Sequence, residues 1–286
     1  MQYEAPASVK EAVGLLAKGG SNARVLAGGT DLLVQLRSGR TKPSLIVDVK
    51  YIDEMCTIVV NKNGFRIGAA VSGAELNEHK KLKKAWPGVV EAMDLIGSTQ
   101  IQGRATLGGN LCNASPAADS VPALIAAGAV ATIAGPSGRR KVPVEKIAKG
   151  PGKTTLKKGE VVVYFTLPQR SSGTGDAYLR MIPRTEMDIA MVGAGVCLTV
   201  DKSGTCTAAR VVLGAVAPTA VLVPNGAKAL IGTKVDEAAL EKLAAAASAA
   251  CKPITDMRGT IEYRTQVAGV LAKRAALIAL KRARKK

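Results

Sequence analysis

The sequence is poor in the side chains on which most hydrolytic and metal sites depend. Its 286 residues include one histidine, His79, and eight aromatic residues. His79 lies in the lysine-rich segment EHKKLKK, which is typical of a solvated surface. Without a second histidine, this chain has no usual partner for a metal site, a Ser-His-Asp triad or a Cys-His pair. We therefore expect no catalytic residue and no metal ligand in it.

The cysteines also lack the spacing of a metal or redox site. No Cys-x-x-Cys pair occurs among Cys56, Cys112, Cys197, Cys206 and Cys251, which excludes a zinc ribbon or an iron-sulfur cluster held by this chain. No apolar stretch approaches the roughly 18 residues that a membrane span needs, and no signal peptide is recognisable. We therefore expect a cytoplasmic protein with no membrane span and no disulfide framework.

Acidic residues are the third shortage: 22 Asp and Glu stand against 40 Lys and Arg, giving a net charge of +18. Residues 258–286 hold nine basic residues and one acid, Glu262, which leaves +10 for the other 257 residues. Such an excess suggests nucleic acid or an anionic surface. However, the few aromatics are scattered and do not interleave with basic residues. The remaining interpretations are a solvated helix face and a charge that complements an acidic partner subunit, and we favour the latter. We place Arg282 to Lys286 at a subunit or solvent surface.

The pattern of apolar and turn residues predicts an α+β fold in two domains. Hydrophobic residues make up 47% of the chain, enough to bury a sizeable core. Near the N-terminus, Ser8 is the expected cap of a helix and Glu11 completes a capping box, and RVLA is a short buried strand. The polar stretch QRSSGTGD, residues 169–176, is the first natural boundary. Beyond it we expect three strands followed by two or three helices.

Two segments come close to nucleotide-binding motifs without matching them. KGPGKTT ends like a P-loop, but Ile147 stands where the leading glycine belongs. GAGVCL begins at Gly193 and reaches Leu198 where a dinucleotide fold needs glycine. Neither a P-loop nor a Rossmann motif is therefore present.

Two glycine loops are better candidates for a phosphate site. AGGTD spans residues 27–31 directly after a strand pattern, and ATLGGN spans residues 105–110. Successive glycines let the backbone approach a ligand, and consecutive N–H groups in a tight turn bind phosphate oxygens. Thr30 and Thr106 add hydroxyl donors at matching places. One such loop is more commonly a plain turn, whereas two in one domain suit a ligand with two phosphates.

The segment NLCNASPAADS, residues 110–120, is rich in small polar residues and precedes an apolar helix. It indicates a loop that places Asn110, Asn113, Ser115 and Asp119 at a ligand. The alternative is a loop that only caps the following helix. Cys112, with no partner nearby, is more simply a small buried side chain than a redox thiol.

Six motifs, taken in order, resemble one protein family. They are RVLAGGTDLL, QIQGRATLGGNLCNASPAADSVPAL, GPGKTTLKKGEVVVYFTLP, RTEMDIAMVGAGV, LGAVAPTAV and DMRGTIEYRTQVAGVLAKRA. Over essentially the whole chain they resemble the medium, FAD-binding subunit of the molybdenum hydroxylases, the family of xanthine dehydrogenase and carbon monoxide dehydrogenase. The resemblance implies a two-subdomain FAD-binding domain of the vanillyl-alcohol-oxidase (PCMH) type in residues 1–172, divided at about residue 55. It also implies a domain like the C-terminal one of the carbon monoxide dehydrogenase flavoprotein in residues 173–286.

The resemblance further implies FAD as the cofactor, with its diphosphate on the backbone amides of the two glycine loops. The residues expected to contact FAD are Arg24, Val25, Leu26, Ala27, Gly28, Gly29, Thr30, Asp31, Ile101, Ala105, Thr106, Leu107, Gly108, Gly109, Asn110, Ser115, Asp119, Val161, Leu179 and Arg180.

The sequence departs from the family pattern close to the expected flavin. Leu179 and Arg180 stand where relatives commonly carry Phe-Lys, which keeps the positive charge but changes its geometry. Ile101 is followed by Gln-Gly where relatives read Arg-Asn, so one positive charge is missing or moved to Arg104. The cysteine-rich insert with a 4Fe-4S cluster that some relatives carry is absent.

Under this resemblance, the shortage of catalytic side chains indicates a division of labour among subunits. A large subunit would hold the molybdopterin-molybdenum centre and a small subunit two 2Fe-2S clusters, in a dimer of heterotrimers. This chain would take electrons from those clusters and pass them from FAD to NAD+, quinone or O2. Two alternatives stay open: a stand-alone FAD oxidoreductase of the same superfamily, and a basic protein that binds nucleic acid or a membrane surface.

Overall fold

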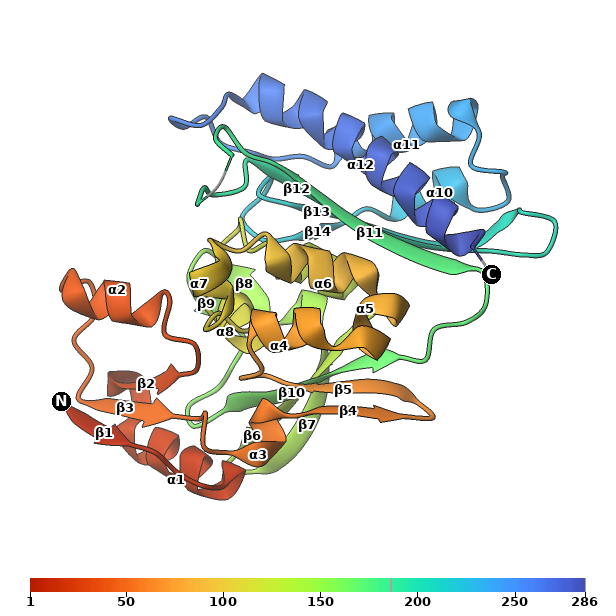
Figure 1. The fold of residues 1–286 in the computed structure, drawn as a ribbon. Helices are drawn as coiled ribbons and strands as arrows, with labels where there is room; N and C mark the ends of the chain where they lie inside the picture. The colour runs from red at the N-terminus through yellow and green to blue at the C-terminus, as the bar shows by residue number, and fades with distance from the viewer. Residues whose placement is uncertain (186, 286) are drawn as a thin grey trace.

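The computed structural model describes residues 1–185 and 187–285, and its elements form two domains that pack against each other (Figure 1). The first subdomain is a parallel sheet in the order β1 (Gln2–Glu4), β3 (Leu45–Asp48), β2 (Ala23–Leu26). Helix α1 (Val9–Gly19) contacts β2 and β3. It buries Val9, Ala12 and Leu16, which its periodicity places on one side.

The start of α1 follows the sequence prediction only in part. Ser8 is the N-cap, and its hydroxyl accepts the N–H of Glu11 at 3.2 Å. The Glu11 carboxylate accepts the N–H of Ala7 at 3.0 Å, not that of Ser8. The predicted capping box is therefore wrong by one residue, because the carboxylate reaches past the cap to the preceding turn.

The second subdomain is built on an antiparallel sheet. Its order is β4 (Ile58–Asn61), β5 (Gly64–Gly68), β10 (Val161–Pro168), β6 (Val130–Gly135), β7 (Gly138–Pro143). Its helices are α3 (Asp53–Cys56), α4 (Gly73–Glu78), α5 (Lys80–Ala85), α6 (Pro87–Asp94), α7 (Thr99–Gln102), α8 (Leu107–Cys112) and α9 (Ser120–Ala126). A small hairpin, β8 (Ala148–Gly150) and β9 (Lys153–Thr154), lies outside the sheet. Helix α9 is buried along its whole length and contacts strands of the second domain.

The C-terminal domain is a sheet covered by helices. Its antiparallel order is β11 (Thr174–Met181), β12 (Val192–Val200), β13 (Cys206–Gly214), β14 (Val221–Leu222). The helices are α10 (Pro224–Leu230), α11 (Glu237–Ala249) and α12 (Ile261–Ala283). The prediction of three strands misses only the two-residue β14, and the α+β prediction is confirmed. Within the described residues, no helix is both long and apolar enough to cross a membrane.

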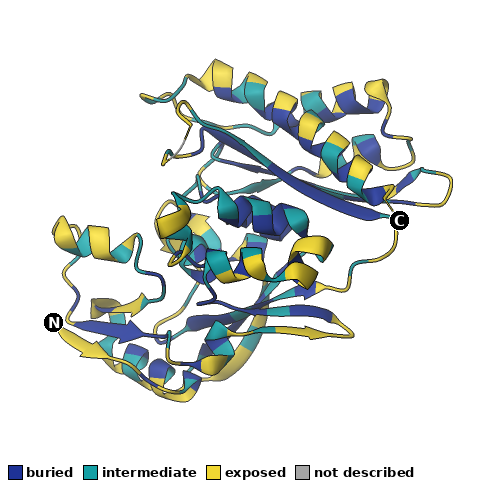
Figure 2. Ribbon diagram, in the orientation of Figure 1, coloured by how far each residue is buried: buried dark blue, intermediate teal, exposed yellow. Residues whose placement is uncertain are grey.

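Strand β2 is not the buried strand that its apolar sequence predicts. It pairs only with β3 and forms an edge of the parallel sheet. Arg24 and Val25 are exposed, and Figure 2 shows that the following helix α2 (Leu32–Arg37) has exposed and half-buried residues but no buried one. The apolar run indicates a strand correctly, but periodicity cannot tell an edge strand from a central one.

Several basic side chains of the C-terminal helix form ion pairs with acidic residues of the same chain. Arg264 is 4% exposed and donates to Asp256 at 2.6 Å and to the carbonyl of Met191 at 2.9 Å. Lys273 contacts two acidic side chains of α11. Arg282 binds Glu91 of the first domain. The prediction of a surface position for Arg282 to Lys286 is therefore confirmed only in part: Arg284 and Lys285 are exposed, whereas Arg282, with 26% of its side chain exposed, is paired within the chain.

Candidate cofactor site

The first glycine loop, residues 27–31, connects the end of β2 to α2. It leaves the carboxyl edge of a parallel sheet, where open α/β sheets commonly bind ligands. Gly29 has φ of 80°, in the left-handed region that favours glycine. A Cβ atom on Gly28 would lie 1.8 Å from the carbonyl oxygen of Arg104. The first loop therefore touches the backbone that leads into the second loop.

The backbone donors of the first loop are free. None of the amide N–H groups of residues 27–31 donates a hydrogen bond to a residue that the structure describes. Gly28 is buried and its neighbours Ala27 and Gly29 are half-buried. Such N–H groups are costly unless a ligand or water accepts from them, and a series of them in a turn suits phosphate oxygens. The loop thus carries the donor set that a diphosphate needs.

The second glycine loop has fewer free donors than the sequence suggests. The N–H of Gly109 donates to the hydroxyl oxygen of Thr106 at 2.9 Å, which makes Thr106 the N-cap of α8. The N–H of Gly108 donates to the carbonyl of Ala69 at 3.0 Å, and that of Asn110 to the carbonyl of Thr106 at 2.9 Å. The two loops therefore differ: all five N–H groups of the first loop lack an acceptor in the described chain, whereas in the second loop only those of Thr106 and Leu107 do, beside the hydroxyl hydrogen of Thr106.

Part of the polar segment 110–119 caps the following helix, which was the alternative to a ligand-binding loop. The side-chain oxygen of Asn110 accepts from the N–H and the hydroxyl of Ser120 at 3.2 and 2.7 Å, at the start of α9. The hydroxyl of Ser115 accepts the N–H of Ala117 at 3.3 Å. Asn113 accepts from Gln35 of α2 at 3.3 Å. These bonds hold the segment in place and connect it to α2, the helix that follows the first loop.

Asp119 forms a buried cluster with the second domain. Its carboxylate accepts the hydroxyl of Tyr178 at 2.8 Å and Nη1 of Arg180 at 2.8 Å. Asp119 is 6% exposed, and burial raises the pKa of its carboxyl to about 6, although Arg180 and Tyr178 partly offset this. Two residues predicted to contact FAD, Asp119 and Arg180, are thus direct partners of each other across the domain interface.

Successive side chains of β11 point to opposite faces of the sheet, so its residues that are predicted to contact FAD lie on different faces. Tyr178 and Arg180 point toward Asp119, whereas Leu179 packs against the hydrophobic core of the second domain. Arg180 is 6% exposed at its side chain, and its Nε has no hydrogen-bond partner among the described residues. A buried donor of this kind calls for an acceptor that the chain itself does not provide.

The remaining predicted residues are more scattered. Arg24 donates to the carbonyls of Ser21 and Ala23, at 2.6 and 2.9 Å, so its guanidinium stays on its own edge of the sheet. The carbonyl of Ile101 accepts the N–H of Ala105 at 2.7 Å and shapes the entry to the second loop. Val161 is buried at the start of β10, opposite Ala134 of β6. A flavin contact for Arg24, Val161 or Leu179 stays a prediction.

One residue of the site, Tyr178, is not among those that the sequence predicts. Tyr178 is 3% exposed, and its hydroxyl bonds to Asp119. Asp176, Tyr178 and Arg180 alternate in a segment with a strand pattern, which places all three side chains on one face. This spacing could have indicated Tyr178 from the sequence. Cys112 is not a reactive thiol, since burial raises its pKa to about 12.

Comparison with protein families agrees with this architecture. The family described as "FAD binding domain in molybdopterin dehydrogenase" matches residues 1–170. The family described as "CO dehydrogenase flavoprotein C-terminal domain" matches residues 177–279. The chain therefore has the two domain types that its motifs imply, the first of which binds FAD.

Known proteins resemble the chain over nearly its full length. It is 36% identical to the carbon monoxide dehydrogenase medium chain of Hydrogenophaga pseudoflava, over 96% of this chain and 95% of that one. It is 30% identical to the xanthine dehydrogenase FAD-binding subunit of Escherichia coli O157:H7, over 95% and 93%.

Solved structures lead to the same conclusion. The carbon monoxide dehydrogenase of Hydrogenophaga pseudoflava that lacks the Mo-pyranopterin moiety superposes with a TM-score of 0.94 at 35% identity, covering 99% of this chain and 98% of that one. Quinoline 2-oxidoreductase from Pseudomonas putida 86 gives a TM-score of 0.91 at 29% identity, with the same coverage. The chain therefore belongs to the FAD-binding medium subunits of the molybdenum hydroxylases, a family of oxidoreductases.

Proposed function

We propose that this chain binds FAD with its diphosphate on the free N–H groups of residues 27–31. The proposal rests on this series of donors: none of them has an acceptor in the described chain, and residues 27–30 are buried or half-buried. The second loop would supply the hydroxyl hydrogen of Thr106 and a wall close to the diphosphate. Asp119 and Arg180 would lie along the rest of the cofactor, which agrees with the unpartnered Nε of Arg180.

FAD, when bound, supplies the capacity to accept electrons singly and to release them singly or in pairs. The chain's residues hold and orient it. Arg180 places a buried positive charge, paired with Asp119, at the contact between the two domains. A cation near a flavin favours its reduced, anionic form, so we expect Arg180 to raise the reduction potential. No residue of the site needs to act as a general acid or base.

We propose that the chain works in a complex. Its partners would be a large molybdopterin subunit and a small subunit with two 2Fe-2S clusters, in a dimer of heterotrimers, with NAD+, quinone or O2 as the final acceptor. Relatives named as medium chains and FAD-binding subunits support this arrangement. The domain boundary at residue 172 is likewise a proposal, supported by its position between the two family ranges. A cytoplasmic location stays a prediction.

The two alternative functions are less well supported. A stand-alone oxidoreductase of the same superfamily would need its own substrate-binding cap, and the second domain is a four-stranded sheet with three helices. A nucleic-acid or membrane-surface protein would use the C-terminal charge, yet Arg264, Lys273 and Arg282 have acidic partners within the chain.

Purification with the neighbouring genes of its operon tests the proposal. We expect a yellow complex in which this chain co-elutes with a molybdopterin subunit and an iron-sulfur subunit. A flavin-containing chain that elutes alone, with activity toward its own substrate, would favour the stand-alone alternative. A colourless chain that binds DNA with a steep salt dependence would contradict the proposal.

A further inference from the structure

Strand β11 lies between one helix of each domain and approaches both closely. It contacts α6 of the first domain and α12 of its own domain. A Cβ on Gly88 of α6 would lie 2.7 Å from the Asp176 carboxylate, and a Cβ on Gly175 would lie 1.9 Å from the carbonyl of Ala279. Both contacts require glycine. The start of β11 is thus held between the two domains with little freedom.

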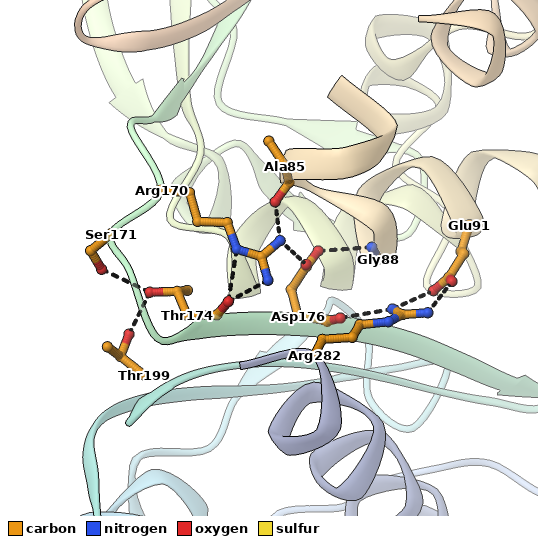
Figure 3. Close-up of polar contacts among 9 residues, drawn as sticks. All are labelled: Ala85, Gly88, Glu91, Arg170, Ser171, Thr174, Asp176, Thr199 and Arg282. Carbon is orange, nitrogen blue, oxygen red and sulfur yellow. Dashed lines mark hydrogen bonds and ion pairs between the residues drawn. The ribbon is translucent and has the colours of Figure 1, made fainter. Parts of the chain in front are cut away.

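Asp176 joins the start of β11 to the first domain. It is 3% exposed, and its carboxylate accepts the N–H of Gly88 at 2.8 Å and Nη1 of Arg170 at 3.1 Å (Figure 3). Arg170, in the connection between the domains, also donates to the carbonyls of Ala85 and Thr174. The polar stretch that the sequence indicates as a linker is therefore fixed at both ends.

Arg282 completes the arrangement from the end of α12. Its guanidinium binds both carboxylate oxygens of Glu91 on α6, one of them at 2.9 Å, and donates to the carbonyl of Asp176 at 2.8 Å (Figure 3). A two-pronged arginine–carboxylate pair fixes direction as well as distance. We call Arg170, Asp176, Arg282 and Glu91 the interdomain latch.

The latch and the cofactor site are on the same face of one strand. Asp176, Tyr178 and Arg180 alternate along β11, and all three bond to the first domain. With a rise of about 3.3 Å per residue, Arg180 lies roughly 13 Å along the strand from Asp176. A hydrogen-bonded strand does not stretch, so a shift at the latch moves Arg180 by a similar amount relative to Asp119.

We propose that the interdomain latch positions Arg180 and encloses the bound flavin, so that Arg282 and Glu91 are positioning residues for electron transfer. This inference rests on the proposed function, because it takes the flavin to lie beside Asp119 and Arg180. The latch itself does not touch that site. It holds the second domain against the first at the other end of the shared strand.

Single substitutions in the full-length, FAD-loaded protein test the inference. Glu91→Gln and Arg282→Met remove the ion pair, and Lys281→Met is the matched control, because Lys281 is exposed on the same helix. We measure quenching of flavin fluorescence by iodide, the rate of FAD release and the midpoint potential of the flavin. Circular dichroism and Tm report the folded state.

Both latch variants should make the flavin more accessible to iodide and release FAD roughly three- to tenfold faster, since domains that are held together less firmly open more often. The midpoint potential should shift in the direction of Arg180→Met, and the control should match the wild type. The double variant should do no more than Arg282→Met alone, because that change already removes the pair with Glu91 together with the bond to the Asp176 carbonyl.

A lower Tm with unchanged iodide access, FAD release and potential would overturn the inference, since it would leave the latch a merely structural role. If the wild-type chain itself holds no FAD, the proposed function fails, and the inference fails with it. The wild-type flavin content therefore separates the two failures.

Discussion

At the residue scale, the two glycine loops differ in the space that they leave for a larger side chain. Gly28 leaves no space for a side chain, since its added Cβ would lie 1.8 Å from Arg104. Gly109 is more open, with only the Thr106 hydroxyl near its added Cβ, at 3.0 Å. The two glycine pairs look alike in sequence, so this difference could not be predicted from it.

Replacing the two glycines should therefore give different results. We expect Gly28→Ala to lower Tm by several degrees, because the Arg104 backbone must move, whereas Gly109→Ala should keep Tm within about 2 °C of the wild type. Thermal unfolding of the two variants in parallel measures this. Equal Tm values for both would show that the two loops do not touch as described.

Asp119 gives the second prediction at this scale. Burial raises the pKa of its carboxyl from 3.8 to about 6, so the folded chain binds the proton more tightly than the unfolded chain does. The free energy of unfolding should then increase as pH falls from 7 to 5, by roughly 1 kcal/mol from this group. Asp176, whose pKa burial also raises to about 6, acts in the same direction.

Urea unfolding of the FAD-free chain at pH 5 and pH 7 measures that dependence. Asp119→Asn should lose about half of it and leave the contribution of Asp176, while lowering stability at both pH values because Arg180 loses its partner. An unchanged pH dependence in Asp119→Asn would mean that this carboxyl does not titrate in the range.

At the element scale, α2 is one of two α-helices of the first domain, with the four-residue α7, in which no residue is buried. Its Leu33 and Val34 are 53% and 65% exposed. The hydrogen bond from Gln35 to Asn113, at 3.3 Å, connects its side chains to segment 110–119. An apolar helix directly after the cofactor loop, without cover of its own, is held weakly in the isolated chain.

We therefore expect fast amide hydrogen exchange in α2 and slow exchange in α9, which is buried along its length. Hydrogen exchange followed by mass spectrometry compares the two helices in the same sample. FAD should slow exchange in α2, because it orders the loop that precedes the helix. Equal protection of α2 and α9 in the FAD-free chain would contradict this account.

At the scale of the whole molecule, sequence patterns predicted the two domain types and the positions of the glycine turns better than the contacts between them. AGGTD and ATLGGN were found because glycine pairs and turn chemistry are local. That Gly28 meets Arg104, or that Asp119 meets Arg180, depends on packing between distant segments. The same limit explains Arg282: its charge was visible, but Glu91 lies 191 residues away in the chain.

The net charge of +18 does not measure how much positive charge the folded chain can offer to a partner. Several cations of the C-terminal helix hold domains or helices together, through Asp256, Glu237 and Glu91. High salt should therefore weaken the ion pairs that are partly exposed, with little effect on the buried Arg264. Composition alone could not separate cations used within the chain from cations offered to a partner.

The proposed function depends on the free N–H groups of residues 27–31, which would hold the diphosphate of FAD. Calorimetric titration of the FAD-free chain with FAD and with riboflavin, which has the same ring but no phosphate, tests it most directly. We expect one FAD per chain, with a Kd at least about 100-fold lower than that of riboflavin, since charge-assisted bonds to phosphate supply much of the affinity. Equal affinity for the two ligands, or no binding of FAD, would contradict the claim.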